Sequence, residues 1–369
     1  MKKRSWLLAL LLILVSPLAA ACSVSTTSTA PEEKDSSIFL SLDGGASWRE
    51  VDYMPTVSGR PESIANLNVN RLEMDPQDNL AVYLASFDEG LFYTYKATDG
   101  WRKVASLPRA TVNDVKVDPK NKCIIYAAIA NRLYRSNDCA RNWSEAYVDN
   151  LPGVGVNSVV VDHYNPANIY IGTSRGEIVK SIDSGAHWRT IQRLDEGVNR
   201  LMTSPLDSRL IFVATEKNRI YSFRSNTVTN PADSADLEGN FLVSDWLDLN
   251  DILREYNLGQ SFKGLLVSPK DGLIFLATEK LILRSADNGV SWEQLNLIPS
   301  EEAAVINALA VDPQDSNHIY YVTNTTFYSS SDGGATWATK KLPTKRAGRS
   351  LLIDFKDPSV IYLGTVKLK

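Results

Sequence analysis

Four basic residues stand at equivalent places in a repeated pattern of this sequence, and their side chains could bind an anion. Each lies at the start of an apolar run that leads into Asp-Pro or a close variant: Arg71, Arg200, Lys263 and Arg349. A guanidinium group suits a carboxylate or phosphate because its planar fork donates two parallel hydrogen bonds. If the repeats form a ring, these side chains converge on one rim. We therefore predict a binding surface there, including Asp114, for an acidic peptide terminus, an acidic sugar or a partner's acidic loop.

The same residues allow a second interpretation, in which the charges hold neighbouring repeats together. Each basic side chain would then pair with a nearby acid such as Glu73, Asp114 or Asp195. An asparagine also recurs at this place in the repeats, and asparagine side chains commonly satisfy backbone groups in turns. From the sequence, binding and structural pairing both remain open.

Support for catalysis is limited to carboxylates in loops that we expect on the same rim: Asp88, Glu89, Asp195 and Glu196. Two such acids at a suitable separation could hydrolyse a glycosidic bond. The three histidines are scattered over different repeats without metal-ligand spacing, and no Gly-rich phosphate loop occurs. We predict neither a metal nor a cofactor. A binding protein is favoured over the alternative, a carbohydrate-active enzyme or a glycan-binding lectin.

A second motif, Ser-x-Asp-x-Gly-x-x-Trp, occurs at residues 41–48, 181–188, 285–292 and 330–337. It returns at 136–143 with Ala140 in the glycine position, and in a shortened form at 98–101. The Asp carboxylate can accept backbone N–H groups of its own turn, and glycine permits a positive φ. We predict a tight turn between antiparallel strands, with structural carboxylates at Asp43, Asp99, Asp138, Asp183, Asp287 and Asp332.

These motifs resemble the Asp boxes (BNR repeats) of sialidases, sortilin-type receptors, xyloglucanases and photosystem II assembly factors. In those families the box joins the third and fourth strands of a β-propeller blade. The sialidase Arg-Ile-Pro motif is missing here, and xyloglucanases place their catalytic acids between two propellers. The photosystem II assembly factors are single seven-bladed propellers, lipid-anchored in cyanobacteria. The Asp-Pro and Ile-Tyr-x-Gly-Thr runs of this chain look more like xyloglucanase and sortilin repeats.

Counting repeats predicts an all-β fold, a single seven-bladed β-propeller over residues 37–369. Seven apolar runs lead into Asp-Pro or a variant, and a second β-rich run such as 361–365 follows each. One box is missing where the polar segment 225–245 is inserted. The C-terminal end supplies only the first two strands of a blade and the N-terminal end only the last two. Sharing one blade would close the ring and leave no unpaired sheet edge, so we expect a monomer.

The first residues predict export and membrane attachment. Three basic residues and a short apolar run at 7–15 form a signal peptide over residues 1–21. Cys22 follows small residues as in a bacterial lipobox, and residues 22–36 form a Ser/Thr-rich disordered tether. Cleavage near Ala21 without lipidation is the alternative. We expect an extracytoplasmic protein anchored to a bacterial membrane through a lipid, at the cell surface, in the periplasm or in a thylakoid lumen.

Two further predictions follow from this location. Cys123 and Cys139 lie on consecutive strands of one predicted hairpin, with Cys123 opposite about residue 137, so a disulfide is possible but its register is open. Loss of the leader takes the formal net charge from −4 to −7, which disfavours nucleic acid as a partner. Together with the resemblance, this predicts a membrane-anchored scaffold that binds a membrane or extracytoplasmic protein, similar to a photosystem assembly factor.

Overall fold

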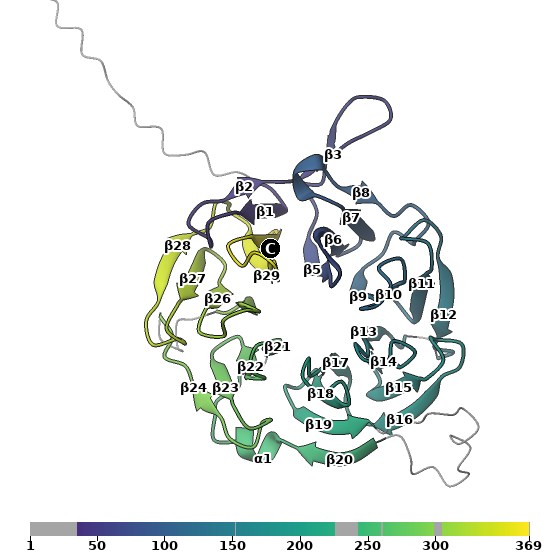
Figure 1. The fold of residues 1–369 in the computed structure, drawn as a ribbon, viewed down its shortest axis with the longest axis vertical. Helices are drawn as coiled ribbons and strands as arrows, with labels where there is room; N and C mark the ends of the chain where they lie inside the picture. The colour runs from purple at the N-terminus through teal and green to yellow at the C-terminus, as the bar shows by residue number, and fades with distance from the viewer. Residues whose placement is uncertain (1–34, 152, 226–242, 260, 299–304, 369) are drawn as a thin grey trace, which may run out of the picture. The chain divides into compact units, whose positions relative to one another are not determined.

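The fold is a ring of seven four-stranded antiparallel sheets, each radiating from a common centre (Figure 1). It is seen in a computed structural model that describes residues 35–151, 153–225, 243–259, 261–298 and 305–368. Within each blade the first strand lies nearest the centre of the ring and the fourth lies at its outer edge (Figure 1). The structure therefore confirms the predicted seven-bladed β-propeller.

The blades are numbered here in chain order from the first complete one. Blade 1 comprises β5 (Val69–Asp75), β6 (Asp78–Ser86), β7 (Leu91–Thr94) and β8 (Arg102–Lys103). Blade 2 comprises β9 (Val112–Val117), β10 (Ile125–Ile129), β11 (Arg132–Ser136) and β12 (Ser144–Val148). Blade 3 comprises β13 (Val156–Val161), β14 (Ile169–Thr173), β15 (Glu177–Ser181) and β16 (Arg189–Arg193).

The remaining blades repeat this arrangement. Blade 4 comprises β17 (Val198–Thr203), β18 (Leu210–Thr215), β19 (Ile220–Ser225) and β20 (Val243–Asp248). Blade 5 comprises β21 (Phe262–Val267), β22 (Ile274–Thr278), β23 (Ile282–Ser285) and β24 (Glu293–Gln294). Blade 6 comprises β25 (Ala308–Val311), β26 (Ile319–Val322), β27 (Thr326–Ser330) and β28 (Ala338–Lys341).

Blade 7 closes the ring with strands from both ends of the chain. It comprises β29 (Ala347–Ile353), β30 (Ile361–Val366), β1 (Ile38–Ser41) and β2 (Arg49–Glu50). Strand β1 pairs antiparallel with β30, with Ile38 opposite Gly364 and Ser41 opposite Ile361. This pairing confirms the closure predicted from the two half-blades. Outside the blades lie the short hairpin β3 (Tyr53–Met54) and β4 (Glu62–Ser63), the turn η1 (Ala97–Asp99) and the helix α1 (Asn250–Leu253).

The hydrophobic core lies between neighbouring blades. Between blades 6 and 7, for example, Phe39, Val322, Phe327 and Leu363 are at most 2% exposed and pack in one cluster. Burial of each such side chain contributes about 1.5–3 kcal/mol. The glycine of the Ile-Tyr-x-Gly-Thr runs makes room for this packing, since a Cβ at Gly172 would stand 2.3 Å from Cγ1 of a valine on the next blade.

Five of the six predicted box carboxylates organise their turns in the same way. Each accepts the backbone N–H four residues later at 2.8–2.9 Å and the hydroxyl of the serine two residues earlier at 2.7–3.0 Å; they are Asp43, Asp138, Asp183, Asp287 and Asp332. Hydrogen bonds led by the Ser47 and Thr336 hydroxyls lower the pKa of Asp43 and of Asp332 to about 2. Ala140 also adopts a positive φ, 67°, at the position where glycine has a φ of 91–93° in the other boxes.

Asp99 departs from this pattern. Its carboxylate is 68% exposed and pairs with Lys96 at 3.6 Å, while Thr94 caps the shortened turn. Trp101 is fully buried and donates its indole N–H to the Val51 carbonyl at 2.6 Å. The shortened box thus keeps the tryptophan anchor, and its aspartate makes no contact of the kind that the other boxes share.

Two further predictions, the insertion and the disulfide, concern connections between the strands of blades 4 and 2. The insertion predicted over 225–245 falls between the third and fourth strands of blade 4, where a box is missing, but its ends belong to the strands: Ser225 to β19 and 243–245 to β20. Residues 226–242 lie outside the described residues. Cys123 and Cys139 form a disulfide, and the Cys139 N–H donates to the Cys123 carbonyl at 3.1 Å. The register with Ile125 opposite Ser136 continues to Cys123 opposite Asp138, one residue beyond the predicted partner.

Candidate functional site

The first strands of the blades are tied to one another by a ladder of asparagine side chains. Asn70 donates to the Val112 carbonyl at 2.8 Å, and Asn113 donates to the Val156 carbonyl at 2.9 Å. Asn157 donates to the carbonyl of Val198 at 2.9 Å, again on the next blade. Each amide therefore satisfies a backbone group of the neighbouring blade. The prediction that these asparagines satisfy backbone groups is confirmed, but they lie in strands β5, β9 and β13 and not in turns, and the carbonyls belong to the next blade.

The position after the asparagine forms a second, parallel set of contacts. The Asp114 carboxylate accepts the Ser158 hydroxyl at 3.0 Å and the Val159 N–H at 3.1 Å. Ser158 in turn accepts the Leu201 N–H at 3.1 Å. Asp114 is 1% exposed and also lies 3.8 Å from Arg71 Nε. A hydrogen-bonded girdle thus links blades 1 to 4 behind the surface of the channel.

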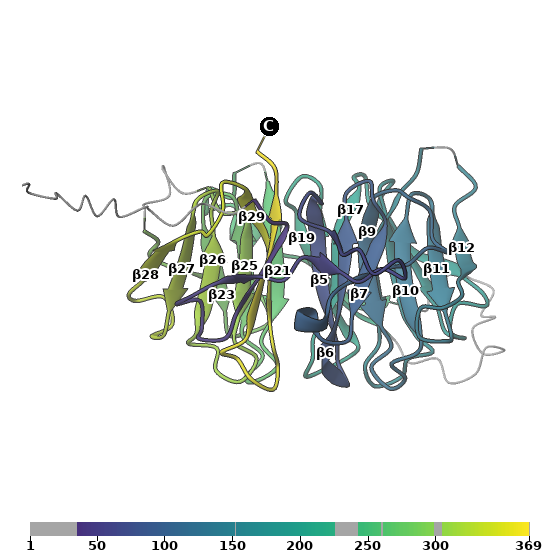
Figure 2. The same cartoon turned by 90° about the horizontal axis from the view of Figure 1, so that it is seen from above.

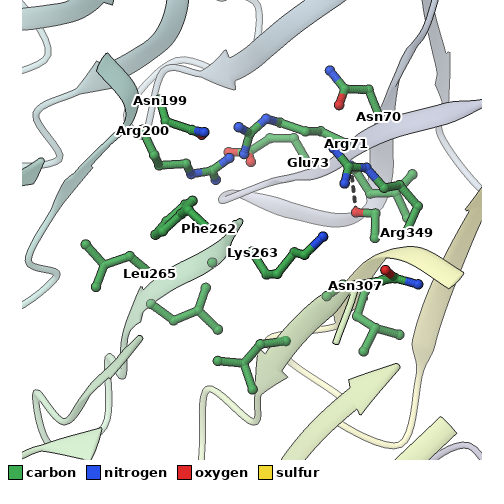
Figure 3. A pocket seen from close by; sticks show the side chains of 17 residues that line it. Asn70, Arg71, Glu73, Asn199, Arg200, Phe262, Lys263, Leu265, Asn307 and Arg349 are labelled. Carbon is green, nitrogen blue, oxygen red and sulfur yellow. Dashed lines mark hydrogen bonds between the residues drawn. The ribbon is translucent and has the colours of Figure 1, made fainter. Parts of the chain in front are cut away.

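A cavity of about 180 Å³ opens where the first strands meet at the centre of the ring (Figure 3). All four predicted basic residues line it, and they come from four different blades: Arg71 from β5, Arg200 from β17, Lys263 from β21 and Arg349 from β29. The structure therefore brings these four side chains together. Asp114 does not line the cavity, because its carboxylate is turned into the girdle.

Acidic partners are unevenly distributed among these cations. Arg71 pairs with Asp114 and donates Nε–H to the Asn113 carbonyl at 2.9 Å. Within the described part of the chain, Arg200, Lys263 and Arg349 make no ion pair, and Arg200 Nη1 is buried without a hydrogen-bond partner. The structural pairing considered from the sequence therefore applies to Arg71 and leaves the other three cations without an ion pair among the described residues.

The electrostatics of the cavity reflect this imbalance. Burial lowers the pKa of Lys263, and the nearby Arg349 guanidinium lowers it further, while the Glu279 carboxylate opposes both effects. The pKa of Arg349 is also lowered, first by burial and then by Arg71. Arg349 lies over the Phe87 ring, 5.7 Å from its centroid, a cation–π contact that holds the guanidinium in place. The cations therefore repel one another in a partly desolvated space.

Glu73 is a lining residue that the prediction treated only as a pairing partner. Its carboxylate accepts the Lys116 ammonium at 2.6 Å, and both side chains are 23% exposed. Burial raises the pKa of Glu73, although Lys116 opposes that shift. Glu73 follows Arg71 by two positions on one strand, so the alternation of a β-strand could have placed both on the channel face. Phe87 has no comparable signal in the sequence.

The loop carboxylates considered for glycoside hydrolysis lie outside this cavity. Glu89 pairs with Arg109 and with Lys103. Glu196 is buried and lies 3.6 Å from Arg219 Nε. Among the residues that line the cavity, Glu73 is the only carboxylate. The channel is therefore suited to bind an anion, and a pair of acids for catalysis is not provided by its lining.

The described residues hold no group of three or more His, Cys, Asp or Glu side chains arranged to bind a metal ion. Over the same residues, no helix is long and apolar enough to cross a membrane.

The chain enters the propeller on the face that carries the channel mouth. The Ser36 and Ser37 carbonyls accept the hydroxyl and the N–H of Thr365, at the end of β30. Arg346, just before β29, pairs with Asp35 at 3.7 Å. The Asp boxes lie at the opposite ends of the strands, where the Gly44 N–H donates to the Ser359 carbonyl. In the side view the two sets of loops form the two faces of the ring (Figure 2).

Comparison with known proteins supports the repeat type and the fold. The family model described as Sortilin, neurotensin receptor 3, matches residues 280–367. No curated protein matches the sequence. The chain therefore carries BNR-type repeats on a seven-bladed propeller, as predicted.

Solved structures of two kinds share this fold. The GH74 xyloglucanase from Xanthomonas campestris aligns with a TM-score of 0.62 at 15% identity, over 81% of this chain and 51% of its own. The GH74 enzyme of Niastella koreensis gives 0.61 at 14%, with the same two coverages. YCF48 bound to D1 peptide gives 0.58 at 14%, over 82% of this chain and 94% of its own. This chain spans about half the length of the GH74 enzymes, and at these identities the likeness concerns the fold alone.

Proposed function

We propose that this protein is a membrane-anchored, extracytoplasmic propeller that binds an acidic segment of a partner protein at the mouth of its channel, as a scaffold for complex assembly. The observation that carries the proposal is the set Arg200, Lys263 and Arg349, three cations that line the cavity and make no ion pair among the described residues. Unpaired buried charge is unfavourable, so a partner's carboxylates would relieve a cost that is present in the free protein.

The point of chain entry agrees with this proposal. Residues Asp35 and Ser36 lie on the face of the channel mouth, and the lipid predicted on Cys22 is a short distance before them in the sequence. A tether of this length reaches at most ~50 Å when extended and about 20 Å as a flexible coil. The basic mouth would then stay close to the membrane, where loops of membrane proteins are within reach. The YCF48 structure, a propeller of the same size with a bound peptide, makes peptide binding by such a fold reasonable.

The experiment is site-specific photocrosslinking in native membranes, with a photoreactive residue in place of Phe87 at the mouth. We expect a crosslink to an acidic segment of one protein, and its loss in the triple variant Arg200→Gln, Lys263→Gln, Arg349→Gln. Arg71 stays unchanged in that variant because it braces the fold through Asp114 and Asn113. Arg254→Gln is the matched control, since that guanidinium, just after α1, is 80% exposed, pairs with Asp251 and does not line the cavity.

A crosslink that survives in the triple variant would refute the role of the cations. Capture of an oligosaccharide in place of a protein would favour the alternative, a glycan-binding lectin or a carbohydrate-active enzyme. That alternative is supported by the fold likeness to GH74 enzymes, while the lining of the cavity offers it a single carboxylate, Glu73.

A further inference from the structure

The charge of the cavity limits which anion can balance it. Four cations and one carboxylate line it, a formal net charge of +3, and the Lys116 and Asp114 charges behind the lining cancel each other. A single carboxylate would leave two positive charges uncompensated in a partly desolvated space. A group with two or three negative charges would compensate most or all of the excess.

The arrangement of the hydrogen-bond donors also favours an anion with several negatively charged oxygen atoms. Arg200, Lys263 and Arg349 project from blades 4, 5 and 7 and face one another across the cavity (Figure 3). Donors from three directions are matched by an ion that presents oxygen atoms on several sides, whereas a single planar carboxylate presents one edge. Arg200 Nη1 is buried and lacks a hydrogen-bond partner in the described structure, so one guanidinium donor of this set is unsatisfied in the free protein.

The cavity volume of about 180 Å³ limits how much of an anion the cavity can enclose. At 10–15 Å³ for each water-sized probe, it holds on the order of ten water molecules. Sulfate and phosphate fit easily within this space, and a small tricarboxylate about fills it.

We propose that the channel binds a free oxyanion with two or three negative charges, of the phosphate, sulfate or tricarboxylate class, and that this anion regulates partner binding by competing for the same cations. The proposal deepens the proposed function and rests on it only for the competition. The bound ion would link three blades across the centre of the ring and so also stabilise its closure.

The test is titration calorimetry on the full-length protein in detergent with sulfate, inorganic phosphate, citrate and acetate, at constant pH and ionic strength. We expect sulfate or citrate to bind at least about tenfold more tightly than acetate. Each substitution Arg200→Gln, Lys263→Gln or Arg349→Gln removes a charge-assisted contact and should weaken binding by about tenfold to a hundredfold. The Arg254→Gln control should bind as the wild type does.

Thermal unfolding provides a readout that misfolding of a variant would not imitate. Because Lys263 repels its neighbours in the free protein, Lys263→Gln should unfold at or above the wild-type temperature without the anion. The same variant should lose the increase in unfolding temperature that sulfate gives the wild type.

Equal responses to acetate and sulfate would overturn the proposal, as would unchanged binding in the three variants. Glycerol phosphate tests the other source of this chemistry, a lipid headgroup: tighter binding than inorganic phosphate would assign the site to a phosphate ester and overturn the free ion. Loss of the Phe87 crosslink on addition of sulfate supports the competition. If the anion binds but no crosslink depends on the three cations, the proposed function is refuted and the anion site stands. If the crosslink depends on the cations but no anion binds, the anion site is refuted and the proposed function stands.

Discussion

Replacing Asp114 tests whether the girdle behind the channel stabilises the ring. In Asp114→Ala, the Ser158 hydroxyl and the Val159 N–H lose their acceptor, and Arg71 loses its acidic partner. Hydrogen bonds to a charged group contribute about 1.5–3 kcal/mol each, and breaking a buried ion pair costs about 3–5 kcal/mol. Because Arg71 is 25% exposed and partly hydrated, we expect a loss of about 3–5 kcal/mol for the whole set. This is a large part of the ~5–15 kcal/mol of a typical domain.

The assay is urea unfolding followed by tryptophan fluorescence, with the midpoint and slope compared between variants. Asp114→Asn retains one acceptor oxygen and should fall between the wild type and Asp114→Ala. Asp99→Ala is the control, since that carboxylate is 68% exposed and its loss should change stability by less than about 0.5 kcal/mol. A loss below about 1 kcal/mol in Asp114→Ala, or an equal loss in Asp99→Ala, would show that the girdle does not hold the blades together.

Three further predictions concern a buried lysine, a buried arginine and the disulfide. Burial lowers the pKa of Lys180 to about 8, so the folded state binds fewer protons than the unfolded state above that pH. The free energy of unfolding of the wild type, relative to that of Lys180→Met, should therefore rise by about 2 kcal/mol between about pH 8 and pH 9.5. A difference in urea midpoints between the two proteins that stays constant over this interval would contradict the prediction. Arg346→Met removes hydrogen bonds to Thr365, Leu67 and Asn68. We expect the free energy of unfolding to fall by about 2–4 kcal/mol and proteolysis at β1 to become faster. An unchanged cleavage rate would argue that Arg346 does not stabilise the closing blade. Cys123→Ala removes a disulfide with a sequence separation of 16 and should lower the free energy of unfolding by about 3 kcal/mol. Unfolding with and without a reducing agent checks this, and a wild type whose stability does not respond to the reducing agent would refute it.

The repeat architecture was predictable because its signals are local. The serine, aspartate, glycine and tryptophan of a box contact one another within one turn, so their spacing alone specifies a tight connection between two strands. The number of blades follows from counting such units. The closing blade follows from the half-blades at the two ends, because an open ring would expose sheet edges. The one-residue difference in the partner of Cys123 shows the limit of this reasoning, since pairing depends on the geometry of the turn.

The sequence also identified which residues converge on the channel, because equivalent positions in a ring of repeats meet at its centre. It could not decide which of them are neutralised. Arg71 and Asp114 occupy the same position on neighbouring blades and pair with each other, so Asp114 became part of the girdle. Arg200, Lys263 and Arg349 make no ion pair among the described residues, and the Glu279 charge only partly opposes the effects of burial and of Arg349 on Lys263. Charge compensation depends on distances between side chains that are tens to hundreds of residues apart in the chain, and only the tertiary structure determines those distances.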